Sequence, residues 1–287
     1  RLVIDGPLLD NSVNNRKLTL LGSFERYNSG SFRSGTGSYP SATVSFSGTA
    51  AQLLGGATGN FNGSNRFWNI EINNASGLTL NEGADIEVGN QLMLTNGVVS
   101  VPPTGRFILL STSQSAVVPA GGSATSWVSG PLTKQIINGE SFLYPLGRGS
   151  IKGHRFTLVS TAGTTASFTA EYFSPNNTAT SIAPPLDVTN TLEYWSVSSS
   201  SPASVRVRIG WDPQSDLTPL VTANGLADMR VAGYSTGMWR EQASSASGNN
   251  NNGEVETTGS VPVGSTPSDF TTASISGTLA RASFSSF

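Results

Sequence analysis

The chain of 287 residues contains no cysteine, a single histidine, three methionines and only 12% charged residues. Its charged share is about half that of an average soluble protein. Ser, Thr, Asn and Gly replace the Glu and Lys that normally stabilise exposed helices. Thr, Val and aromatic residues favour strands, and Asn-Gly and Ser-Gly favour the turns between them. We therefore expect an all-β protein.

The same absences bear on compartment and partners. Without cysteine the chain forms no disulfide bond. A cytosolic protein can lack cysteine. A large secreted bacterial protein can also lack it, because a large core makes stabilising disulfides unnecessary. The Ser/Thr/Asn/Gly surface favours the extracellular or cell-surface location. A net charge of −2 without like-charge runs argues against nucleic acid. No apolar run approaches the ~20 residues of a membrane span.

The first part of the chain alternates apolar and polar residues. In NASGLTLNEGADIEVGNQLMLTNGVVSV the alternation stops at Asn-Glu-Gly and at Thr-Asn-Gly. Every second side chain, such as Trp68, Ile70 and Ile72, is expected to face a core. Such segments recur at roughly twenty residues, which is typical of a solenoid. One coil cannot bury its apolar face alone, so coils must stack. We predict a β-helix-like stack over residues 1–130, with an antiparallel sandwich as the alternative.

The strands become longer and richer in aromatic residues after Gly130-Pro131, as in HRFTLVSTA, TASFTAEYFS, LEYWSVSS and ASVRVRIGW. About seven such strands predict an immunoglobulin-like β-sandwich over residues 131–287. Arg206 and Arg208 alternate with apolar residues and fit a solvated sheet face, with an anion or glycan contact as the alternative. The segment SSASGNNNNGE has no large apolar residue, so we expect a mobile exposed loop.

Several phrases suggest a family. SATVSFSGTAAQLLGG, RFWNIEINNASGLTLNEG and NQLMLTNGVVSV are followed by GPLTKQIINGESFLYPLG. From about residue 40 to 276 the chain resembles the repetitive surface proteins of Bacteroidota. The resemblance implies export by the type IX secretion system and a role in adhesion, gliding or extracellular fibres. The implied partners are the chain itself, tandem modules, or cell-surface and secretion-machinery proteins. The ends Arg1-Leu2-Val3 and LARASFSSF carry no initiator methionine or sorting module, so we expect a mature form or a fragment.

A search for reactive groups finds little. His154, in IKGHRFTLV, has cations beside it in the sequence and no carboxylate, so we expect a structural or surface role rather than a catalytic one. There is no Gly-x-Ser-x-Gly, P-loop or His-Glu-x-x-His motif. We therefore assign no catalytic, cofactor-binding or metal residue and expect a protein that is not an enzyme.

A glycosidase needs two carboxylates facing each other about 5 to 10 Å apart. Glu71, Asp85 and Glu87 lie at alternate strand positions, where we expect a solvated polar face. The candidates are Glu71, Glu82, Asp85, Glu87, Glu171, Glu193, Asp212 and Asp216. In WDPQSD, Asp212 and Asp216 could also supply oxygens to Ca²⁺. That segment lacks the dense Asp/Asn/Gly run of a dedicated calcium loop, and no metal site is assigned.

These observations favour a non-enzymatic extracellular structural or adhesive module, with self-assembly into a fibre as one form of it. The alternative is a carbohydrate-binding module of a larger secreted polysaccharide-degrading protein. Trp68 and Trp195 are expected in the core. Trp211 and Trp239 are expected at the edge of the core, or exposed as platforms for sugar rings under the alternative. A β-helix lyase or glycosidase is the third hypothesis.

Overall fold

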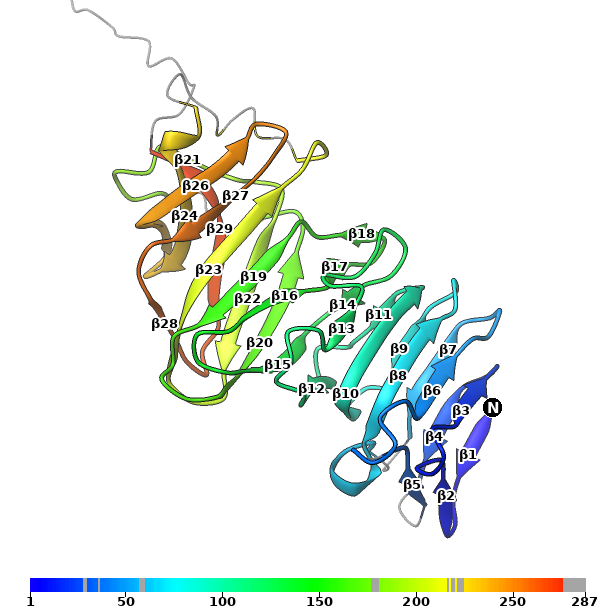
Figure 1. The fold of residues 1–287 in the computed structure, drawn as a ribbon. Helices are drawn as coiled ribbons and strands as arrows, with labels where there is room; N and C mark the ends of the chain where they lie inside the picture. Colours follow the sequence, from blue (N-terminus) through cyan, green and yellow to red (C-terminus); the bar gives the residue numbers. More distant parts are fainter. Residues whose placement is uncertain are drawn as a thin grey trace, which may run out of the picture.

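The computed structural model describes residues 1–27, 30–35, 37–56, 60–176, 181–215, 217, 220 and 225–275. Strands account for 54% of the chain and helix for 2%, which confirms the all-β prediction. The helical segments are two 3-10 turns, η1 (Gly63–Asn65) and η2 (Leu226–Asp228). A membrane-crossing helix is thus absent from the described part of the chain. The molecule is elongated, with stacked coils at the amino-terminal end and antiparallel layers at the other (Figure 1).

The stacked coils run along two long sheets. One is an 8-stranded sheet with the order β1 (Leu2–Ile4), β4 (Phe24–Arg26), β7 (Gln52–Gly55), β9 (Leu78–Leu80), β11 (Val99–Ser100), β14 (Val128–Ser129), β17 (Leu146–Arg148) and β18 (Ile151–Lys152). All its pairs are parallel except β17 with β18. Each strand therefore belongs to the next coil of a solenoid-like stack, as predicted.

The other long sheet has thirteen strands. It begins in the coils with β3 (Lys17–Leu20), β6 (Thr43–Phe46), β8 (Phe67–Asn73), β10 (Asp85–Asn96), β12 (Arg106–Leu109) and β15 (Leu132–Ile136), with β13 (Val117–Val118) beside β10. These strands pair in parallel. A short parallel pair, β2 (Leu8–Asp10) and β5 (Ser31–Arg33), adds a third side to the first coils. Ser45 pairs with Glu71, which lies 26 residues further on and one coil along.

Strand β15 is where the stack changes character. On one side Thr133 pairs in parallel with Ile108, and on the other it pairs antiparallel with Thr169. From there the same sheet continues antiparallel through β20 (Ala166–Phe173), β22 (Tyr194–Ser199), β29 (Ser268–Ser274), β24 (Met229–Ser235) and β25 (Met238–Gln242), with β21 (Val188–Thr189) beside β29. One sheet thus joins the coils to the carboxy-terminal layers.

A second antiparallel sheet covers this carboxy-terminal part. Its order is β16 (Ser141–Tyr144), β19 (Phe156–Ser160), β23 (Ala203–Trp211), β27 (Asn252–Thr257) and β26 (Ser244–Asn249), with β28 (Val261–Val263) beside β23. Phe156 of this sheet stacks on Trp195 of the 13-stranded sheet, with ring centroids 5.2 Å apart. One hydrophobic core runs from Ile4 in the first coil to Phe270 in β29. Parallel pairing continues to β17, past Gly130, so sheet and core cross the predicted boundary unbroken.

Phenylalanine rings fill the interior of the first coils. The ring centroids of Phe24 and Phe61 lie 4.8 Å apart, those of Phe61 and Phe67 5.0 Å apart, and those of Phe32 and Phe67 5.3 Å apart. All four rings are buried. Because the rings come from different segments, their tilted and stacked contacts hold neighbouring coils together.

The corners between the two long sheets are closed by buried polar side chains. The Gln52 amide donates to the carbonyls of Leu20 and Gly22 at 3.0 and 2.7 Å. One coil further on, the Asn74 amide donates to the Ala50 carbonyl at 2.8 Å and to the Gln52 side chain at 2.9 Å. These groups satisfy carbonyls that turn inward where the chain changes direction, and a buried carbonyl without a partner is costly.

Two details differ from the sequence predictions. Ile70 and Ile72 are buried as predicted, but Trp68 is partly exposed and packs over Gly35 and Gly89, while Phe67 takes the core position. Phe67 and Ile70 both face the core, so the alternation breaks within β8, at the point where its pairing with β10 changes register. The segment SSASGNNNNGE is not a loop: β26 and β27 form a hairpin, whose turn is closed by backbone amides donating to the Asn249 side chain.

We predict that Asn74→Ala lowers the free energy of unfolding by about 1–3 kcal/mol, because it leaves the Ala50 carbonyl without its side-chain donor in a buried corner and leaves Gln52 Oε1 with the Gly48 amide alone. Denaturant unfolding measures the difference. Asn73→Ala is the matched control, since Asn73 is exposed and its loss should change stability by less than about 0.5 kcal/mol. Equal effects of the two substitutions would contradict the proposed role of the corner.

Candidate functional site

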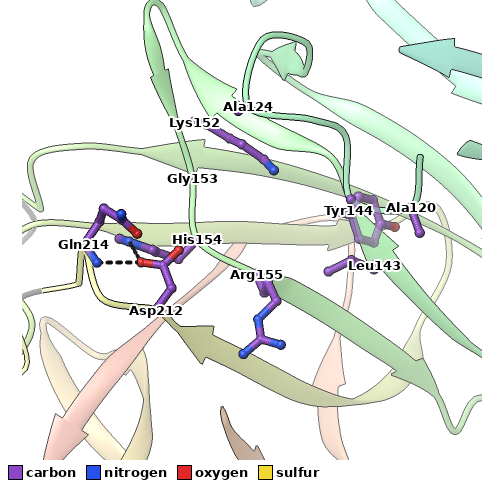
Figure 2. A pocket seen from close by; sticks show the side chains of 11 residues that line it. Ala120, Ala124, Leu143, Tyr144, Lys152, Gly153, His154, Arg155, Asp212 and Gln214 are labelled. Carbon is purple, nitrogen blue, oxygen red and sulfur yellow. Dashed lines mark hydrogen bonds and ion pairs between the residues drawn. The ribbon is translucent and has the colours of Figure 1, made fainter. Parts of the chain in front are cut away.

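The candidate site is a cavity of about 520 Å³ where the last coil meets the antiparallel layers. Its lining comes from the segment around Ala120, from β16 at Leu143, from Lys152 at the end of β18 and the following residues up to Arg155, and from the turn after β23. Figure 2 shows these side chains around the opening. The site contains the only histidine of the chain.

His154 is held between two carboxylates. Its Nδ1 lies 2.6 Å from Oε1 of Glu193, and its Nε2 lies 3.5 Å from Oδ1 of Asp212. Glu193 directly precedes β22 in the 13-stranded sheet, and Asp212 directly follows β23 in the covering sheet. The sequence neighbours of His154 include no carboxylate, so neither contact was visible in the sequence. Both partners are remote in the sequence, and only the packing of the two sheets brings them to the ring.

The surroundings favour the protonated ring. Burial acts to lower the pKa of His154, but the hydrogen bond with Glu193 and the negative charges of Glu193 and Asp212 outweigh it and raise the pKa. The imidazolium then donates through Nδ1 to Glu193 and points Nε2 at Asp212. With both ring nitrogens facing carboxylates, the ring offers no lone pair to a nucleophile or a metal. Within the described residues, no three His, Cys, Asp or Glu are grouped to hold a metal ion.

The other charged groups of the cavity differ in how they are fixed. Arg155 donates through Nη2 to the carbonyl of Gly253 and the side chain of Asn252, both at 2.9 Å, and points away from His154 in Figure 2. The ammonium of Lys152 has no hydrogen bond or ion pair with any described residue. Its burial lowers its pKa, and the charge of Asp212 acts in the opposite direction.

Asp212 is fixed from two sides. Besides facing His154, its Oδ1 accepts the backbone amide of Gln214 at 2.9 Å. Its side chain is still 45% exposed, so it keeps acceptor capacity toward the cavity. Asp216, the second residue of the calcium hypothesis, lies outside the described residues, and that hypothesis stays a prediction.

The remaining carboxylates have separate partners away from this cavity. Lys17 contacts Glu71, Thr104 contacts Glu82, Arg106 contacts Asp85, the Gly63 amide contacts Glu87, and Arg148 contacts Glu171. Burial acts to raise the pKa of Glu71, but the hydrogen bonds from Lys17 and Ser45 outweigh it and lower the pKa. Among the eight candidates, the structure brings Glu193 and Asp212 to one common side chain.

The tryptophans and arginines singled out in the sequence are accounted for by packing. Trp195 is buried, as predicted, and so are Trp211 and Trp239. Trp211 donates through its indole N–H to the Asn249 carbonyl at 2.8 Å. The alternative in which Trp211 or Trp239 is an exposed sugar platform is therefore wrong. Arg208 forms an ion pair with Glu256 at 2.7 Å across the outer face of the covering sheet.

No family model matches the chain, and neither a curated protein nor a solved structure shows significant similarity to it. What the cavity and the stack do is therefore inferred from their own geometry.

We predict a pH-dependent contribution of His154 to stability. Because its pKa is raised in the folded protein, the contribution is complete below the unfolded pKa of about 6.5 and is lost as the pH rises through the folded pKa. At pH ~6 the free energy of unfolding of the wild type should be roughly 1–2 kcal/mol larger than that of His154→Gln, and this difference should shrink toward pH ~9. Urea unfolding at both pH values measures it. A difference in unfolding free energy that does not change with pH would contradict the proposal that a protonated His154 is held between Glu193 and Asp212.

Proposed function

We propose that this chain is a non-enzymatic structural or adhesive module of an extracellular bacterial surface protein or fibre. The observation that carries the proposal is that one sheet and the main core cluster continue from the first coils to β29. We infer that a body joined in this way transmits its length and orientation from one part to the other. The resemblance to Bacteroidota surface proteins exported by the type IX system supports the same assignment, with the carboxy-terminal layers as an immunoglobulin-like sandwich.

The outer faces suit repeated weak contacts. Ser, Thr and Asn side chains alternate outward along the strands, and charges there are paired across strands, as Lys17 is with Glu71. Such a surface gives little affinity at any one point. Repeated along a rod or displayed on many copies, it gains strength through multivalency.

Self-association is proposed through the face formed by β1, β2 and β3. β1 and β3 are the terminal strands of the two long sheets, and β2 ends the short one, so the outer edges of these three strands pair with no described strand. Val3 and Leu8 are 40% and 48% exposed there. Lys17, which could protect the edge of β3, is engaged with Glu71. The occupant we propose is the same end of a second copy, because it presents the same three edges and a two-fold axis can match them.

We predict that the wild type dimerises with rising concentration and that the double substitution Val3→Lys and Leu8→Lys weakens this association by about tenfold or more, because charges on strand edges block pairing. Sedimentation equilibrium measures the association. Leu192→Lys is the matched control, since Leu192 is 49% exposed and lies at the carboxy-terminal end. A wild type that stays monomeric at the highest concentration would remove the fibre from the proposal and leave the adhesive module.

A further inference from the structure

We propose that the cavity beside His154 binds a carboxylate-bearing sugar, a hexuronic acid unit of an acidic polysaccharide, through Lys152 and Asp212. The inference rests on the adhesive function proposed above and names a ligand class for it. It differs from the sugar-platform hypothesis, because it uses no tryptophan.

The cavity has the size and the walls of a saccharide site. Its volume of about 520 Å³ falls within the range of about 300–1,000 Å³ found for small-molecule pockets. Ala120 and Leu143 form an apolar wall, against which the C–H face of a sugar ring can lie. Tyr144 does not contribute its hydroxyl, which donates to the Phe168 carbonyl at 2.9 Å.

The charge requirement comes from Lys152. Its ammonium extends over the cavity in Figure 2, between His154 and Asp212 on one side and Tyr144 and Ala120 on the other. Lys152 is exposed; the negative charge of Asp212 acts on it, but its ammonium forms no ion pair with any described residue. A bound carboxylate would supply a direct counter-charge, whereas a neutral hexose would not.

Asp212 restricts the ligand to a single charge. Its carboxylate is held by His154 and the Gln214 amide and keeps its exposed side toward the cavity. A phosphate or sulfate placed on Lys152 would bring further negative charge toward this carboxylate, which is unfavourable. Sugar hydroxyls, by contrast, donate to a carboxylate. One carboxylate next to several hydroxyls, on an apolar ring face, is the chemistry of a hexuronic acid.

The rigidity of the acceptor adds to the argument. His154 ties together the β18–β19 connection, the segment before β22 and the turn after β23 through its two carboxylate contacts. Asp212 is thereby positioned before any ligand arrives, so little conformational freedom is lost on binding.

The test uses the full chain and four probes: glucuronate, galacturonate, glucose and inorganic phosphate, titrated while amide chemical shifts are recorded by NMR. At least one uronate should bind about tenfold more tightly than glucose or phosphate. The chemical-shift changes should centre on residues 120–124, 152–155 and 212–214.

Lys152→Gln should weaken uronate binding by about tenfold. Arg66→Gln, which removes an exposed cation in the coils, should leave it unchanged. Asp212→Asn should allow phosphate to bind, because the negative charge that repels phosphate from the cavity is removed.

Each outcome decides the proposal. Lys152 is exposed, so its variant is expected to fold, and an unchanged unfolding midpoint verifies this. The absence of uronate binding at millimolar concentrations, equal binding of phosphate by the wild type, or an unaffected Lys152→Gln variant would each overturn the inference. If the wild type self-associates but does not bind uronate, the pocket is rejected and the structural module stands. If the wild type binds uronate but stays monomeric, the pocket stands and the fibre is rejected.

Discussion

The structure depends on one requirement, that the backbone N–H and C=O groups along the strand edges inside the stack find partners. A coil of this chain offers two or three short strands whose edges are satisfied only by the coil before and the coil after. Stacking is therefore obligatory, and it sets the parallel pairing of both long sheets. The parallel stacking ends at β15, where Thr133 pairs with a parallel strand on one side and with an antiparallel strand on the other. That strand converts an open-ended stack into a closed pair of layers.

Corners are the second demand of such a stack, because a chain that turns sharply directs carbonyls into its own interior. Gln52 and Asn74 meet this demand with amide side chains that reach into the preceding coil. At Gly97 the backbone itself makes the turn. Gly97 has φ +95°, and a Cβ atom there would lie 1.8 Å from the Asn74 carbonyl oxygen, so only glycine fits. The high Asn and Gly content of the sequence thus has interior as well as surface causes.

Sequence periodicity predicted the parts of the fold that obey strict alternation. Ile70, Ile72, Ile86 and Val88 are buried because period two is a property of the strand itself. It failed for Trp68, because the alternation of β8 breaks between Phe67 and Ile70, where the pairing with β10 changes register.

The hairpin of β26 and β27 was missed for a different reason, since it is held by backbone pairing and by the Asn249 side chain rather than by large apolar residues. The site was least predictable of all. Glu193 lies 39 residues from His154, and no local pattern links them. Only the packing of two sheets does.

The orientation of the hydrogen bonds gives the molecule a mechanical direction. Strands lie across the stack, so their ladders of hydrogen bonds run along its length. Tension applied to the first residue loads the edge of β1 against β4 alone, and the pairs there open one after another, as in a zipper. Load spread across the wide face of the stack is shared by many pairs at once. A load distributed along the flank is therefore resisted by more hydrogen bonds at once than the same load on the amino-terminal coil.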